Sequence, residues 1–403
     1  MADELRVINT EEERRKRRRQ NKEKDSLPFG CGSRLTVAVI VFLILGAVVF
    51  DAFKWDDISP DGLARHASIA DSQKEEAYTD ITGSSVLEKN FQSLNSGLIY
   101  ISDTSIVQLN HDCEKDFSEK HSFTNPLLKT SGIYTIVFNE GSDEYRIIYD
   151  KHKIHSGTQG TCITDCDIND SGDYCVLSDQ TGYLSCLSVY NKSNEFVYSY
   201  SFSDYYAVSV SISKDGSKVA VGAMNSSDGR LVSKVYLLDV TKNEPIEVYT
   251  YEGQLIYEIK FIADDRFAVI TDLLTSVVRS DGSKEIPYSY SSQILTAYDI
   301  CYGKDIVLSL SKSDDGRSCS LITLNSDGYE IGSFATDLKI VALDAAEDRT
   351  AVISYGKLSI YGSFGDLFGE WDIGTDVKSV IFPQNKTVYV LGVSGITKMS
   401  LKY

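Results

Sequence analysis

Eight short apolar segments recur along this chain, each after a polar turn. They begin at Leu98, Ile133, Tyr174, Lys218, Arg266, Asp305, Thr350 and Thr387. The steps between them are 35, 41, 44, 48, 39, 45 and 37 residues, close to the roughly 40–50 residues of a four-stranded propeller blade. The pattern predicts an all-β chain that closes into a β-propeller of eight four-stranded blades, with seven blades as the alternative.

Each repeat has the pattern of a β-hairpin. In residues 207–223 apolar side chains alternate with serine, a polar turn follows at Lys214, Asp215 and Gly216, and the alternation then resumes. Such alternation on both sides of a glycine turn is typical of two half-buried antiparallel strands. Ring closure needs one further strand, because only residues 396–401 remain after the last repeat. Residues 77–91 are the expected donor, since a blade built from both ends of the chain leaves no open edge.

The first 80 residues have a different composition. Residues 14–24 contain eight Lys or Arg and one Glu, and residues 35–50 carry no charge. Those sixteen residues would rise about 24 Å as a helix, slightly less than the roughly 30 Å of a bilayer core. We therefore expect a basic cytoplasmic tail at 1–33, a single transmembrane anchor at 34–55, a polar stalk at 56–77 and the propeller at 78–403. The positive-inside rule places the propeller outside the cytoplasm.

The charge balance limits the ligands of the outer domain. Residues 51–403 hold 30 basic and 51 acidic residues, a net charge of −21. Nucleic acids and anionic lipid surfaces reward clusters of Lys and Arg, so neither is expected as the main ligand. The expected partners are the membrane, through the N-terminal helix, and a protein or a cell-envelope polymer.

Residues 235–249 and 321–334 look like the third strand and following turn of WD40-like and quinoprotein-like blades. The resemblance covers about residues 83–403, without the WD dipeptide or the quinoprotein tryptophans and cofactor-binding residues. Together with the tail, anchor and stalk, the chain resembles a family of membrane-anchored propeller proteins of Gram-positive bacteria that has no assigned activity. The resemblance implies a propeller at the cell surface.

No local motif indicates catalysis, a cofactor or a metal. The GxSxG and HExxH patterns are absent from the sequence. His152 and His155 would point to opposite faces of a strand. The series Asp165, Asp167 and Asn169 is similar to a calcium loop but lacks its sixth-position Gly and twelfth-position Glu, so a hairpin with an acidic outer face and turn is expected there.

Cysteine and tyrosine supply the remaining candidates. A two-residue turn at Asp170 and Ser171 would make Cys166 and Cys175 opposite neighbours, as buried thiols or as a disulfide. Exposed Tyr beside Ser is typical of adaptable binding surfaces. The candidate binding patch therefore comprises Tyr205, Tyr206, Tyr288 and Tyr290, whose alternative role is packing between blades.

These observations favour a non-catalytic binding or assembly platform at the cell envelope, held by one helix in the cell membrane. The alternative is an extracytoplasmic enzyme that acts on cell-wall polymer through acidic residues at the propeller channel. A signal transducer is disfavoured, because the short tail contains no recognisable output domain.

Overall fold

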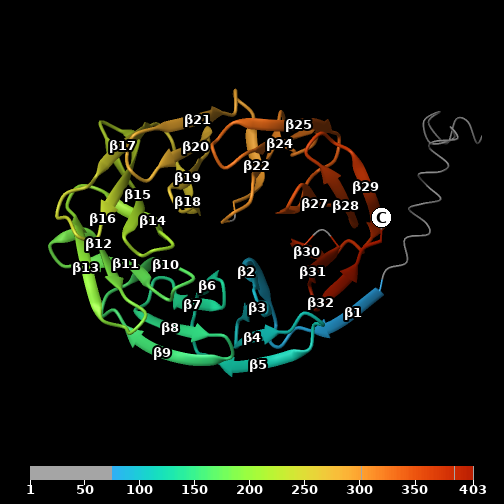
Figure 1. The fold of residues 1–403 in the computed structure, drawn as a ribbon, viewed down its shortest axis with the longest axis horizontal. Helices are drawn as coiled ribbons and strands as arrows, with labels where there is room; N and C mark the ends of the chain where they lie inside the picture. The colour runs from blue at the N-terminus through green and yellow to red at the C-terminus, as the bar shows by residue number, and fades with distance from the viewer. Residues whose placement is uncertain (1–74, 301, 385, 403) are drawn as a thin grey trace, which may run out of the picture. The chain divides into compact units, whose positions relative to one another are not determined.

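The computed structural model describes residues 75–300, 302–384 and 386–402. In this part of the chain 32 strands form eight four-stranded antiparallel sheets, and the sheets stand as blades around a central axis (Figure 1). The expected eight-bladed all-β propeller is confirmed. Among the described residues there is no helix with the length and apolar character needed to span a bilayer. The anchor expected at 34–55 lies outside the described residues.

Blades 1 to 8 are numbered in chain order, and their innermost strands line the axis. These are β2 (Val86–Leu94), β6 (Pro126–Ser131), β10 (Ile163–Ile168), β14 (Tyr206–Ile212), β18 (Ile256–Ala263), β22 (Ile294–Asp299), β26 (Ala342–Ala346) and β30 (Val377–Gln384). The second strands contain the repeated apolar segments. They are β3 (Gly97–Ser102), β7 (Tyr134–Asn139), β11 (Tyr174–Gln180), β15 (Lys218–Ser227), β19 (Arg266–Thr271), β23 (Ile306–Ser311), β27 (Arg349–Ser354) and β31 (Thr387–Gly392).

The two outer strands of each blade complete the sheet. The third strands are β4 (Ser105–Leu109), β8 (Glu144–Tyr149), β12 (Tyr183–Tyr190), β16 (Arg230–Asp239), β20 (Leu274–Arg279), β24 (Cys319–Leu324), β28 (Lys357–Gly362) and β32 (Gly395–Ser400). The outermost strands are β5 (Lys115–Lys120), β9 (His152–Thr158), β13 (Phe196–Phe202), β17 (Glu247–Glu252), β21 (Glu285–Ser289), β25 (Glu330–Thr336), β29 (Leu367–Asp372) and, in blade 8, β1 (Glu75–Asp80).

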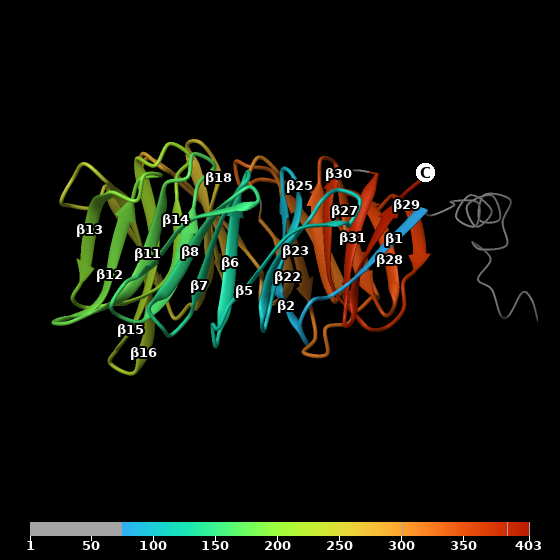
Figure 2. The same ribbon diagram turned by 90° about the horizontal axis from the view of Figure 1, so that it is seen from below.

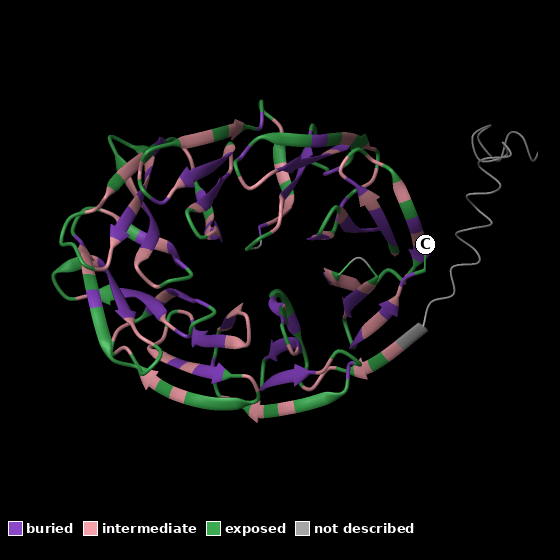
Figure 3. Ribbon diagram, viewed as in Figure 1, coloured by how far each residue is buried: buried purple, intermediate pink, exposed green. Residues whose placement is uncertain are grey.

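The hydrophobic core lies between blades. Eight clusters of buried side chains each join two neighbouring blades. A second strand is therefore covered on both faces, and β3, β19 and β23 are almost entirely buried (Figure 3). Burial on both faces removes the alternation of polar residues, which is why these strands appeared as continuous apolar segments in the sequence.

The ring closes through both ends of the chain. β1 pairs antiparallel with β32, with Glu75 opposite Ser400 and Asp80 opposite Gly395. The expected closure is confirmed, although the donor ends at Asp80 and residues 86–91 belong to β2 of blade 1. β1 also begins three residues before the expected propeller start at residue 78. Asp71–Tyr403 forms one compact unit, and it contains the whole ring and all eight core clusters.

The two ends of the blades form different surfaces. The lower face consists of the turns between second and third strands and of the connections from one blade to the next. It lies at the bottom of Figure 2, where the long hairpin β15–β16 protrudes. The upper face carries the turns between first and second and between third and fourth strands. This division decides which connecting loops can act together.

Candidate functional site

The channel wall contains carboxylates that join neighbouring blades. On β10, Asp165 Oδ2 accepts a hydrogen bond of 2.9 Å from the Val210 N–H, and Asp167 Oδ2 accepts one of 3.0 Å from the Ile212 N–H. The two carboxylates and the two β14 donors have the same two-residue spacing. An innermost strand has an unpaired backbone edge, and these side chains satisfy part of the β14 edge.

Hydroxyl groups repeat this arrangement one blade further on. Ser209 and Ser211 on β14 accept the N–H groups of Ile259 and Phe261 on β18, each over 3.0 Å. Ser211 also donates a 2.8 Å hydrogen bond to Asp167 Oδ2. Blades 3, 4 and 5 are therefore connected by one continuous series of side chains. The expectation that Asp165 and Asp167 lie on the outer face of a hairpin is wrong, because their strand is the innermost one.

Two lysines reach across this series. Lys129 Nζ lies 2.8 Å from Asp165 Oδ2, and Lys260 Nζ lies 3.3 Å from Asp167 Oδ1. Burial alone would raise the pKa of Asp167, but Lys260 and Lys129 hold it below its ordinary value. Burial raises the pKa of Glu258 despite the same two lysines, and its Oε2 accepts a 3.1 Å hydrogen bond from the Tyr298 hydroxyl. The charges in this wall are thus largely paired with one another.

Two carboxyl groups from different blades also meet in the channel wall. Asp344 on β26 is hydrogen-bonded to Asp299 on β22, and burial followed by the negative charge of Asp299 raises the pKa of Asp344 well above its ordinary value. Asp299 Oδ2 accepts the Ala345 N–H at 2.9 Å, and Asp344 Oδ2 accepts the Phe382 N–H. Glycosidase carboxyls stand about 5–10 Å apart around the scissile bond. Direct contact leaves no such space, so this pair joins blades 6, 7 and 8.

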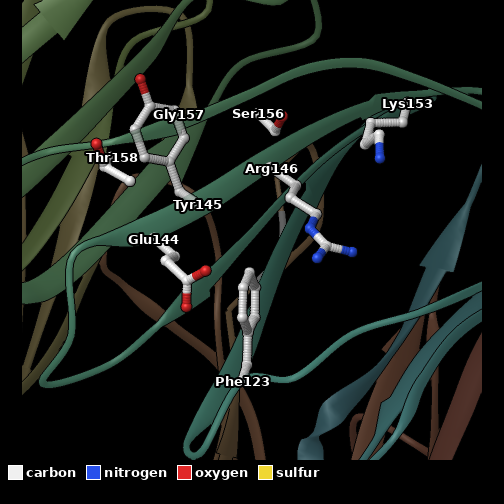
Figure 4. Close-up of a pocket in the computed structure, with 8 residues that line it drawn as sticks. All are labelled: Phe123, Glu144, Tyr145, Arg146, Lys153, Ser156, Gly157 and Thr158. Atoms are coloured by element: carbon white, nitrogen blue, oxygen red, sulfur yellow. The ribbon is translucent and has the colours of Figure 1, made fainter.

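The rim of blade 2 contains an open hollow of about 410 Å³. Figure 4 shows Phe123, Tyr145, Arg146 and Lys153 around it. Both cations already contact Glu119, Arg146 over 2.8 Å and Lys153 over 2.7 Å. No group of three or more His, Cys, Asp or Glu side chains suited to a metal occurs in the described part of the chain. The hollow therefore offers neither an unpaired cationic pair nor a metal site.

The expected register of Cys166 and Cys175 is wrong by one residue. Cys166 lies opposite Val176, and Cys175 lies opposite Asp167. Gly172 is the cause: its φ of +90° adds a left-handed residue to the turn and makes a three-residue loop. Cys166 packs in the cluster of blades 2 and 3, and Cys175 in that of blades 3 and 4. Both thiols are free and buried.

The four candidate tyrosines lie near the lower face but have different environments. Tyr206 is exposed at the start of β14, and Tyr205 packs partly on the core below Lys234. The Tyr288 hydroxyl donates to Glu330 over 3.0 Å. Tyr290 is only 1% exposed and hydrogen-bonds Thr275, so its assignment to an exposed patch is wrong.

A patch of five exposed apolar residues, Tyr206 among them, is assigned to the lower face of blades 4, 5 and 6. One other member begins β22, two lie in loops of blade 5, and one lies at the start of β18. All five side chains are 37–55% exposed. The patch comprises Tyr206, Leu255, Tyr257, Leu273 and Ile294. It is bordered on one side by the protruding β15–β16 hairpin and on the other by the 312–318 loop between β23 and β24. Clustered exposed apolar groups with a polar border are typical of interaction sites.

Hydrogen bonds hold the loops of this patch in place. Asp272 Oδ1 accepts the Leu255 N–H at 2.9 Å, and the Thr271 hydroxyl donates to the Leu274 carbonyl and accepts the Leu274 N–H. Beneath them Tyr290 fills the core between blades 5 and 6. A surface fixed in this way loses little conformational entropy on binding.

Sequence reasoning found Tyr206 and missed the other four members of the patch. The signal for Tyr206 was Tyr and Ser in adjacent positions, whereas Leu255 and Leu273 lie in two separate loops and Ile294 begins β22. The sequence signal for these residues was an apolar residue beside polar ones, either in the connection between two blades or in the turn between the second and third strands of a blade. A single instance of that signal means little, because scattered exposed apolar residues are normal.

Comparisons with known proteins agree with the fold. The model for a family of unknown function, DUF5711, matches residues 67–401. The C-terminal WD40 domain of Sif2 is 12% identical with a TM-score of 0.57, over 81% of this chain and 99% of that one. BamB from Moraxella catarrhalis is 12% identical with a TM-score of 0.50, over 80% and 100%. These structural likenesses show the fold alone, and no match was found among curated proteins. The family match shows that this chain belongs to the DUF5711 family.

Proposed function

We propose that this protein is a non-catalytic binding platform whose lower face docks a partner protein on the patch of blades 4 to 6. The observation that carries the proposal is the group of five exposed apolar side chains on the lower face, three at strand starts and two on loops fixed by hydrogen bonds. Tyrosine, here Tyr206 and Tyr257, is enriched among the few residues that dominate the binding energy of protein interfaces.

The charge of the platform favours a partner that is basic around an apolar centre. Asp204, Asp228 and Glu252 are exposed at the border of the patch, and the outer domain carries a net charge of −21. Complementary charge at a rim mainly raises the association rate and selects among partners. Raising the ionic strength should therefore slow association more than it speeds dissociation.

In this proposal residues 34–55 anchor the chain in the cell membrane and the propeller lies outside the cytoplasm. The support is the charge asymmetry around the apolar segment: ten basic residues lie within residues 1–34. Protease added to intact cells that express the chain should release a propeller fragment of about 36 kDa (about 110 Da per residue) and leave the basic tail protected. Protection of the propeller would refute the proposed orientation.

The enzyme alternative receives no comparable support. The channel carboxylates of Asp165, Asp167, Asp299 and Asp344 all accept backbone N–H groups from the next blade. A catalytic acid or base needs a free path to its substrate. These four groups serve as connections between blades.

Affinity capture with residues 71–403 as bait tests the proposed surface. The test variant carries Tyr206→Ser, Tyr257→Ser and Leu273→Ser. A matched control carries Tyr149→Ser, Tyr329→Ser and Phe364→Ser, which remove three exposed rings from the upper face. Loss of even one anchor should weaken binding by about tenfold or more, so the test variant should lose the partners that wild type and control retain.

Two results would contradict the proposal. One is equal recovery of the same partners by all three baits. The other is equal loss by the test and control variants, which would indicate general stickiness of exposed rings. Circular dichroism should first show that both variants keep the wild-type melting curve, because exposed substitutions change stability little.

A further inference from the structure

The outermost strand of each blade presents an unpaired backbone edge, and seven of the eight strands protect that edge. Charged residues, proline or glycine interrupt β1, β5, β9, β17, β21, β25 and β29. These are the usual means by which natural edge strands avoid pairing with another chain. The remaining strand, β13, reads FVYSYSF and contains no charge, proline or glycine.

The geometry of β13 leaves its outer edge open. Its pairing with β12 is regular from Tyr198 to Phe202 after one irregularity near the start of the strand. Tyr198 and Phe202 are buried against blade 4, while Phe196 and Val197 are 61% and 46% exposed. β13 lies on the outer rim of the ring (Figure 1). Alternate backbone groups of Tyr198–Phe202 therefore point outward without a partner strand.

The sequence of β13 is complementary to itself. When two copies pair antiparallel about Tyr200, Tyr200 faces Tyr200 of the second copy, Tyr198 faces Phe202, and Ser199 faces Ser201. Aromatic side chains then oppose aromatic ones, and serine opposes serine, an arrangement that stabilises antiparallel ladders. A twofold interface requires this kind of self-complementarity.

Charge makes β13 the least unfavourable of the outer edges for pairing with a second copy. Two copies of an outer domain with a net charge of −21 repel each other. Self-pairing through β1 or β17 would add further acidic groups to the contact, since these strands read EEAYTD and EVYTYE. Among the outermost strands of the eight described blades, β13 contains no charged residue, proline or glycine. We propose that the protein forms a homodimer by antiparallel pairing of β13 with β13 of a second copy.

The small size of the contact sets its strength. A ladder of five residues per copy buries less surface than a standard stable interface. The dissociation constant of the isolated propeller is therefore expected between about 10 μM and about 1 mM. Attachment of both copies to one surface would raise their effective concentration and strengthen the dimer.

Sedimentation velocity of residues 71–403 over a concentration series tests the proposal. Wild type should shift from monomer to dimer, and Ser199→Lys should weaken dimerisation by about tenfold or more, because it places a charge on the edge of each copy. Ser118→Lys is the control: Ser118 is exposed in the middle of β5 and faces no proposed contact. This control should dimerise as wild type does. A wild type that stays monomeric to about 1 mM, or a Ser199→Lys variant that dimerises equally, overturns the proposal.

Cysteine cross-linking checks the strand and its register even if a charged variant folds poorly. In a Cys162→Ser background, which removes an exposed thiol, a mixture of Ser199→Cys and Ser201→Cys chains should form a disulfide dimer under mild oxidation, since opposite Cβ atoms lie about 4.5–5.5 Å apart. Ser118→Cys chains should not. Equal cross-linking by Ser118→Cys, or none by the mixture, would show that β13 is not the interface.

Discussion

The Asp167 side chain should contribute several kcal/mol to the free energy of unfolding of the propeller. Its side chain is 2% exposed and accepts hydrogen bonds from the Ser211 hydroxyl at 2.8 Å and the Ile212 N–H at 3.0 Å, beside Lys260 at 3.3 Å. Asp167→Ala leaves a buried backbone donor and a partly buried ammonium without their acceptor. Removing one partner of a buried pair usually costs about 3–5 kcal/mol, and an orphaned donor alone about 1–3 kcal/mol. The free energy of unfolding should fall by about 3–5 kcal/mol.

Urea and thermal unfolding of residues 71–403, followed by circular dichroism, measure this change. A loss of that size corresponds to a melting temperature lower by roughly 4–7 °C for a domain of this length. The control is Asp170→Ala, three residues along the chain, because Asp170 is exposed and lies 3.6 Å from Lys214. An exposed pair contributes about 0–1 kcal/mol. If Asp167→Ala and Asp170→Ala unfold within about 0.5 kcal/mol of each other, the idea that channel carboxylates connect the blades is wrong.

Three further predictions concern ring closure, pH and the N-terminal segment. Removing residues 396–403 deletes most of β32, including the buried Ile396, Met399 and Leu401, and burial of each such side chain contributes about 1.5–3 kcal/mol. Calorimetry of the truncated propeller should therefore show loss of the cooperative unfolding transition. An unchanged midpoint would refute closure by both termini. Because the folded-state pKa of Asp344 is raised, its contribution is present below the unfolded pKa and is lost as pH rises through the folded pKa. Wild type should therefore lose more melting temperature than Asp344→Asn between about pH 5 and pH 9, and parallel curves would contradict the raised pKa of Asp344 beside Asp299. Deleting residues 1–60 should leave the melting temperature of the propeller unchanged in the same calorimeter, and a large shift would show that these residues stabilise the ring.

Much of the fold could be predicted because each blade repeats the same local signal. The second strands are covered on both faces, so their apolar runs stand out at regular intervals. Counting those runs gave the eight blades, and counting strands at the two ends gave the closure by β1 and β32. Both inferences depend on sequence order and strand periodicity alone.

The register at the third blade needed the three-dimensional structure. Whether Gly172 lies inside the turn or in the strand changes the partner of every residue on β10. Its left-handed φ of +90° places it inside the turn, and Cys166 consequently faces Val176. A glycine accepts either conformation at little cost, so the sequence left the choice open.

The sequence by itself determined the composition of the blades, the acidic charge of the domain and the uncharged character of β13. Tertiary structure alone decided which residues share a surface: Tyr206, Leu255 and Ile294 lie on the same lower face although about 90 residues separate the first from the last. It also placed Asp165 and Asp167, which were expected on the outer face of a hairpin, where they connect neighbouring blades. The physical reason is that periodicity fixes the face of a residue within its own strand, whereas contacts between blades depend on how the ring closes in space.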